Sequence, residues 1–112
     1  MTKAVGLSWA KELAFTGKPI TATNAKSIGL VNHCVDAGKA LEVALEMART
    51  ISSNGPIAVA AAKAAIVGGF GTPRDKGMEI ERENYEKVLK TKDRVEGLTA
   101  FAEKRKPVYT GQ

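Results

Sequence analysis

Helical spacing of apolar residues runs through almost the whole chain, and only one short segment departs from it. Val5, Trp9 and Leu13 recur at i, i+4 and i+8, which places them on one face of a helix. The segment 30–35, LVNHCV, is partly β-branched and has no helical period, so it is the only strand candidate. Because a strand without a partner is not stable in water, this segment must pair outside the chain or form an extended linker. The pattern predicts a mainly α fold, with five or six helices and one short strand or extended segment.

Glycine, proline and small polar residues mark the expected ends of these helices. Gly17 suits the left-handed position after a helix and Pro19 cannot continue one, so the first helix should end there. Thr21 is the expected N-cap of a short second helix, and Pro56 suits the first turn of a later one. The other helices are expected after an N-cap at Asp36 and at residues 57–67, 74–90 and 92–104, with a glycine-rich loop over 68–73.

Length and composition limit the chain to one globular domain at most. It has 112 residues, of which 44% are hydrophobic and 26% charged, as in ordinary globular proteins. No apolar run approaches the ~20 residues that a membrane span requires, and the first residues lack the apolar region of a secretion signal. The single cysteine, Cys34, excludes an internal disulfide and favours a reducing compartment. We therefore expect a soluble domain inside the cell.

The chain is basic, and this restricts its partners only loosely. Seventeen Lys and Arg residues against twelve Asp and Glu give a net charge of +5. Such a balance suits nucleic acid, an acidic membrane or a phosphorylated small molecule equally well. Aromatic residues make up only 5% and do not alternate with basic ones, so the sequence does not favour a nucleic-acid surface.

Three glutamates on one predicted helix are the first candidates for acid–base chemistry. Glu79 and Glu83 share a helix face at i, i+4, with Glu81 between them, and paired carboxylates can raise one another's pKa. Lys76 and Arg82 are interleaved with them, however, which is typical of a solvated, ion-paired helix face. We favour this second interpretation.

The remaining local patterns do not predict a nucleophile, a metal site or a phosphate loop. His33 and Cys34 are neighbours in the strand candidate, where adjacent side chains point to opposite faces. One histidine and one cysteine cannot by themselves form a conventional zinc site. The glycine-rich run 68–71 follows no predicted strand and lacks the Lys-Ser/Thr pair of a P-loop, so we interpret it as a helix-terminating loop.

The segment 101–107, FAEKRKP, is the most suggestive one. Three adjacent cations beside the aromatic ring of Phe101 could bind a phosphate group and an adenine ring. The alternative is a helix C-terminus whose cations complement the helix dipole, and the residues alone leave both open.

Three segments in this order carry a resemblance to a known family. They comprise AVG at 4–6 with AKELAFTG at 10–17, then ITATNAKSIGLV at 20–31, and finally TKDRVEGLTAFAEKRKP at 91–107. Together they resemble the crotonase superfamily, the enoyl-CoA hydratase/isomerase enzymes, and the likeness covers essentially the whole chain. It implies that residues 1–112 form the C-terminal helical region, about the last two-fifths of the fold, without the N-terminal spiral core.

The resemblance implies that no catalytic residue lies in this sequence. In the family, two backbone N–H groups stabilise the enolate of the thioester, and two glutamates of the hydratases add water. All of these elements precede the position that corresponds to Met1. We therefore expect the chain to be inactive alone and to need no metal and no cofactor. Acyl-CoA is expected as the substrate of the full protein.

The resemblance does imply a role for Phe101 and Lys104. In the family the last helix covers the coenzyme A of a neighbouring subunit, and its Phe-x-x-Lys pattern approaches the adenine and the 3′-phosphate. The other helices build a trimer, usually within a dimer of trimers. Phe101 and Lys104 match this pattern, so we expect them to bind coenzyme A.

Two other functions stay open beside this one. The chain could be a non-enzymatic helical module that associates with itself through exposed trimerisation faces. It could also bind RNA, as some family members are reported to do, with an affinity that falls steeply with salt. The sequence does not distinguish hydratase from isomerase, the length of the acyl chain, or the bacterial cytoplasm from the mitochondrial matrix.

Overall fold

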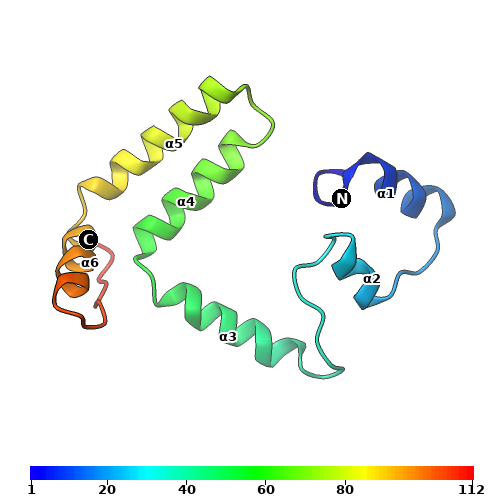
Figure 1. The fold of residues 1–112 in the computed structure, drawn as a ribbon, viewed down its shortest axis with the longest axis horizontal. Coiled ribbons are helices and arrows are strands. Elements are labelled where there is room, and N and C mark those ends of the chain that lie inside the picture. The colour runs from blue at the N-terminus through cyan, green and yellow to red at the C-terminus, as the bar shows by residue number, and fades with distance from the viewer. The chain divides into compact units, whose positions relative to one another are not determined.

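The computed structural model describes residues 1–112 and contains six α-helices and no β-strand, so the predicted mainly α fold is confirmed. The segment 30–35 is irregular, so the extended linker forms rather than the strand, since no partner strand exists. The helices are α1 (Thr2–Thr16), α2 (Ala22–Ser27), α3 (Ala40–Ser52), α4 (Pro56–Gly69), α5 (Arg74–Leu89) and α6 (Lys92–Ala102), shown in Figure 1.

The chain divides into two compact units, residues 1–43 and residues 44–112, with the boundary inside α3. In the first unit, Gly6 has φ 79° and ψ 170°, so α1 is interrupted one turn from its start rather than continuous. Val5 and Ala10 are buried, as is Ala25 of α2, whereas Trp9 is 43% exposed. The apolar stripe expected on α1 is therefore only partly covered.

Three of the predicted helix-end signals are confirmed, and the predicted cap at Asp36 is wrong. Gly17 has φ 60° after α1, the Thr21 hydroxyl accepts from the backbone N–H of Asn24 at 3.2 Å, and Pro56 begins α4. Asp36 does not cap α3, because its carbonyl instead accepts from Lys39 N in a turn (3.0 Å) and the helix begins at Ala40. Gly38, with φ 83°, interrupts helical backbone between them.

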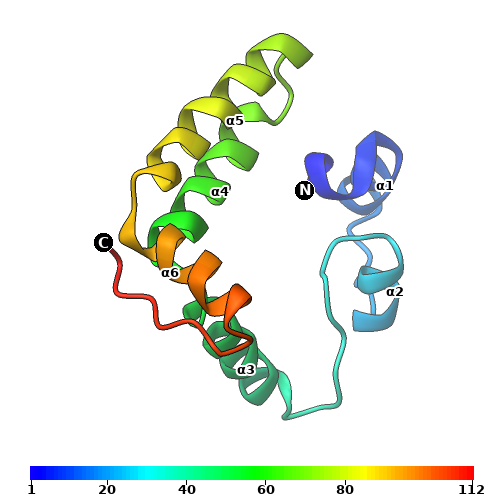
Figure 2. The ribbon, with the colours of Figure 1, turned by 60° about the vertical axis from the view of Figure 1, so that its left-hand side comes forward.

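In the second unit, α4 and α5 form an antiparallel hairpin and lie side by side in both views (Figures 1 and 2). Gly68 and Gly69 belong to α4, so the connecting loop is 70–73 and shorter than expected. A Cβ added to Gly69 would lie 3.7 Å from Gly77 Cα, and one on Gly68 only 3.1 Å from Ile80 Cγ2. Small residues thus let the two helices approach closely.

The buried apolar core is small. Its members are one valine and four alanines, and no large side chain is fully buried: Val5, Ala10, Ala25, Ala61 and Ala100. α3 buries no residue at all, and Leu41, Leu45, Met47 and Ile51 along it are exposed. No helix has both the length and the apolar character needed to cross a membrane.

Candidate functional site

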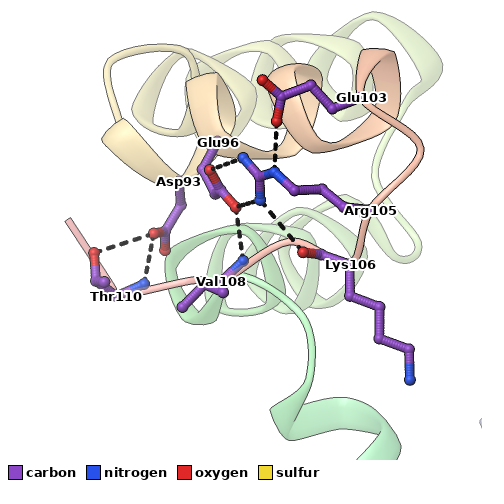
Figure 3. A network of polar contacts seen from close by, with 7 residues as sticks. All are labelled: Asp93, Glu96, Glu103, Arg105, Lys106, Val108 and Thr110. Atoms are coloured by element: carbon purple, nitrogen blue, oxygen red, sulfur yellow. Dashed lines mark hydrogen bonds and ion pairs between the residues drawn. The ribbon is translucent and has the colours of Figure 1, made fainter.

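The expected coenzyme-A contacts lie at the C-terminal end of α6, next to a tail formed by residues 103–112. α6 ends at Ala102, two residues before the predicted end, because the chain turns at Lys104. The tail then runs back along the helix (Figures 2 and 3) until Asp93 N, near the start of α6, donates to Gln112 O at 3.0 Å. The tail is therefore attached along the length of α6.

Asp93 binds the far end of the tail. Its Oδ1 accepts from the backbone N–H of Thr110 at 2.7 Å, and its Oδ2 accepts from that of Gly111 at 2.9 Å. The Thr110 hydroxyl lies 3.4 Å from the same Oδ1 (Figure 3). Asp93 is only 6% exposed, so these donors take the place of water around a buried carboxylate.

Glu96 of α6 binds the near end of the tail through Arg105, which is itself a tail residue. Arg105 Nη1 and Nη2 lie 2.6 and 3.0 Å from the two carboxylate oxygens of Glu96, a bidentate ion pair (Figure 3). Glu96 Oε1 also accepts from Val108 N at 2.8 Å, and Arg105 Nε donates to Glu103 at 2.6 Å. The bonds from Arg105 and then from Val108 lower the pKa of Glu96 to about 2, while those from Glu96 and Glu103 raise the pKa of Arg105.

These contacts divide the three adjacent cations of the sequence into two kinds. Arg105 is paired with two carboxylates, those of Glu96 and Glu103. Lys104 and Lys106 make no ion pair, and the Lys106 side chain extends away from the network in Figure 3. Only the two lysines therefore offer an unpaired cation.

Phe101 and Lys104 occupy adjacent positions at the end of the helix. Phe101 is 86% exposed, although its neighbour Ala100 is completely buried. Lys104 N donates to Phe101 O at 3.2 Å, which joins the two residues through the backbone. Their binding of coenzyme A stays a prediction.

The other candidate residues are not arranged for catalysis. Glu79 pairs with Lys76 at 2.7 Å, and this bond lowers the pKa of the carboxyl group, the opposite of what a general acid needs. Cys34 Sγ lies 4.0 Å from the Thr23 hydroxyl and not against His33. No three side chains of His, Cys, Asp or Glu gather where they could hold a metal ion.

An apolar groove between α4 and α5 is the second feature of this unit. It has a volume of about 700 Å³, and its walls come from both helices and the loop between them, among them Ala61, Ala65, Ile66, Phe70, Met78 and Tyr85. This groove was not predicted from the sequence. The alanine-rich run of α4 does predict a shallow helix face, and large side chains of α5 can form the wall beside it.

Comparison with known proteins identifies the family. The sequence model of the family described as enoyl-CoA hydratase/isomerase matches residues 1–112. The chain belongs to this family. The crotonase resemblance is thereby confirmed, and the helical architecture matches the C-terminal region of that fold.

Three similar proteins of the enoyl-CoA hydratase/isomerase family are longer than this chain. A probable mitochondrial enoyl-CoA hydratase 2 of Arabidopsis thaliana is 53% identical over 99% of this chain and 37% of its own length. The mitochondrial methylglutaconyl-CoA hydratase of Mus musculus is 39% identical over all of this chain and 37% of its own. The crystal structure of enoyl-CoA hydratase from Bacillus anthracis has a TM-score of 0.96 and 47% identity, and the chain covers 43% of it. The chain thus spans about two-fifths of its relatives.

The enoyl-CoA hydratase/isomerase resemblance predicted Phe101 and Lys104, but sequence reasoning missed the residues that hold the tail. Asp93 and Thr110 are 17 residues apart, and Glu96 and Arg105 are 9 apart. Neither separation is one that helical periodicity examines. The available signal was the acid in the first turn of α6, which the helix dipole alone also explains.

Proposed function

We propose that this chain is the part of an enoyl-CoA hydratase-like enzyme that covers coenzyme A and contacts neighbouring subunits. Phe101 would stack on the adenine ring, and Lys104 would pair with the 3′-phosphate. The full protein would add water to a 2-enoyl-CoA thioester. This proposal joins the family membership of residues 1–112 to the two residues at the end of α6.

One observation carries the proposal: an exposed aromatic residue and an unpaired lysine stand three residues apart at the end of α6, joined by a backbone hydrogen bond. Phe101 is 86% exposed, so its ring is accessible to a partner. Lys104 has no carboxylate partner, whereas the adjacent Arg105 has two. A ring and a cation three residues apart suit the flat base and the phosphate of an adenosine 3′-phosphate.

A binding measurement tests this directly. Titration calorimetry should show that the chain binds coenzyme A more tightly than 3′-dephospho-coenzyme A. Lys104→Ala should remove that preference, with a loss of about tenfold for coenzyme A. Lys106→Ala removes the same charge two residues away and should have little effect. Equal losses in both variants would mean that net charge, rather than a site, attracts the phosphate.

We also propose that the chain is inactive alone. The glutamate pair considered for acid–base chemistry, Glu79 and Glu83, lies on a helix face where Lys76 pairs with Glu79. Stabilisation of an enolate requires donors aimed at the thioester oxygen, and the family resemblance assigns these to residues before Met1. The purified chain should therefore leave crotonyl-CoA unchanged, and hydration well above the buffer rate would contradict the proposal.

Self-association is the second candidate function, and the groove between α4 and α5 favours it. The groove is apolar, and Met78 and Tyr85 in its wall are 58% and 60% exposed. Burying such surface between copies would stabilise a chain with a small core. Sedimentation should show an oligomer that Met78→Glu weakens and that Phe15→Glu, on the exposed end of α1, does not. A compact monomer that binds no ANS would contradict this function.

The compartment is a proposal as well. The relatives include proteins named as mitochondrial and a protein of Bacillus subtilis. Their distribution supports the mitochondrial matrix or the bacterial cytoplasm for the full protein.

A further inference from the structure

The end of α6 has a backbone conformation that its residue does not favour. Lys104 has φ 54°, and it is the only residue other than glycine with a positive φ; the others are six glycines. Lys104 N donates to Phe101 O at 3.2 Å, and Arg105 N donates to Ala100 O at 3.0 Å. This is the Schellman arrangement, in which the left-handed position usually belongs to glycine because a Cβ there approaches the carbonyl oxygen.

Contacts on the C-terminal side of Lys104 impose this conformation. Arg105 is held by both oxygens of Glu96 and by Glu103, so its position relative to α6 is fixed (Figure 3). Glu96 also accepts from Val108 N, which brings the next residues of the tail to the same carboxylate. A residue held at both ends in this way can persist in a sparsely populated backbone region.

The lysine side chain takes no part in the network that strains its backbone. Its ammonium group makes no ion pair and no hydrogen bond to the tail, although the preceding residue, Glu103, carries a carboxylate. Glycine would satisfy the turn without strain. A helix-dipole role does not require this position either, since Lys106 supplies an unpaired cation two residues later. Contacts of the Lys104 side chain within the chain therefore do not account for a lysine at this position.

We propose that Glu96 and Arg105 are positioning residues, whose bidentate pair holds Lys104 in the left-handed conformation and so directs its ammonium group to the anion that Phe101 and Lys104 bind. This inference rests on the proposed function, since it takes the 3′-phosphate of coenzyme A as that anion. Arg105 acts through the backbone and does not touch the phosphate.

The sign of a charge change distinguishes positioning from simple electrostatics. Glu96→Gln removes a negative charge near the anion, so electrostatics alone predicts tighter binding of coenzyme A. Loss of the bidentate pair predicts the reverse, because Lys104 is then free to leave its conformation. Arg105→Lys keeps the net charge but cannot form the two parallel bonds, so only positioning predicts an effect.

The experiment measures two quantities on the 112-residue chain and on each variant. Calorimetry gives the preference for coenzyme A over 3′-dephospho-coenzyme A, and the three-bond coupling between the amide and Hα protons of Lys104 gives its φ. We expect Glu96→Gln and Arg105→Lys each to reduce the preference at least about threefold and to move the coupling away from the left-handed value. Lys106→Ala should change neither quantity. Amide exchange at Ala100 verifies that α6 remains folded in each variant.

Each of the other outcomes contradicts either the proposed function or the positioning role of Glu96 and Arg105. A wild-type chain without preference for the 3′-phosphate would contradict the proposed function and this inference with it. A wild-type preference that survives Glu96→Gln while the coupling changes would contradict the inference alone. An unchanged coupling in both variants would show that the ion pair does not impose the left-handed turn, and would also contradict it.

Discussion

The C-terminal ends of α1 and α6 both pass through a residue with a left-handed backbone, a glycine in α1 and a lysine in α6. At the end of α1, Gly17 has φ 60°, and at the end of α6, Lys104 has φ 54°. Glycine adopts this conformation without a steric cost, whereas a residue with a Cβ loses roughly 1–2 kcal/mol. The same backbone requirement is met once by the favoured residue and once by an unfavoured one.

The surroundings of the two turns explain the difference. A Cβ on Gly17 would meet nothing within 4 Å, and the turn there depends on the glycine itself. After Lys104, the tail is fixed to α6 by Glu96 and Asp93, so the turn is imposed from outside. Local sequence controls the first helix end, and tertiary contact controls the second.

Removal of the far anchor of the tail should have the largest effect. Asp93→Ala leaves the backbone N–H groups of Thr110 and Gly111 without their charged acceptor, so the free energy of unfolding should fall by about 2–3 kcal/mol in urea titrations. Asp75→Ala is the matched control, because Asp75 is also an acid in the first turn of a helix but is exposed. Asp75→Ala should lower the free energy of unfolding by about 0.5 kcal/mol, which is the typical contribution of an acid at a helix N-terminus. Equal losses would mean that the tail contributes nothing.

An exchange of the two turn residues tests the comparison itself. Lys104→Gly should raise the free energy of unfolding by about 1 kcal/mol, and Gly17→Lys should lower it by about 1 kcal/mol, since one relieves and the other creates a strained φ. Gly17→Ala should match Gly17→Lys, because no neighbour meets the added side chain. If Lys104→Gly destabilised the chain, the lysine side chain would have a structural role that the contacts do not show.

The fold was predictable where the signal was local. Gly17 with Pro19, Thr21 and Pro56 gave helix boundaries correctly, because each residue acts on its own backbone. The N-cap predicted at Asp36 is wrong, because Gly38, between Asp36 and the helix, has a left-handed conformation. Periodicity predicted five or six helices, and six form. It did not predict which faces are covered, because burial depends on what packs against them.

The end of α6 could not be predicted from local signals. Lysine is a strong helix former, so the pattern extended the helix to 104, whereas the chain turns at Lys104 and Arg105 pairs with Glu96, nine residues away. The same holds for the site: the Phe-x-x-Lys pattern identified Phe101 and Lys104 through resemblance. The commitment of Arg105 to carboxylates, which removes it from the candidate anion ligands, is visible only in three dimensions.

Acid should loosen the end of α6 and spare that of α1. The pKa of Glu96 in the folded chain is about 2, below its ordinary value of 4.5, so folding favours the ionised form. Its stabilisation is therefore complete above about pH 4.5 and is lost as the pH falls toward 2. Urea titrations at a series of acidic pH values should show this decline, and Glu96→Gln should reduce it. The protection of Gly17 N, corrected for intrinsic exchange, should not follow the same curve.

The smallest stability effects are expected at the two phenylalanines near these helix ends. The two variants should nevertheless differ in coenzyme A binding. Phe15 on α1 is 81% exposed and Phe101 on α6 is 86% exposed, so truncation of either to alanine should change the free energy of unfolding by no more than about 0.5 kcal/mol. Only Phe101→Ala should weaken coenzyme A binding, because only Phe101 stands at the helix end that carries Lys104. Calorimetry of the matched pair measures the difference. Equal affinities would mean that Phe101 does not stack on the adenine, even where Lys104 binds the phosphate.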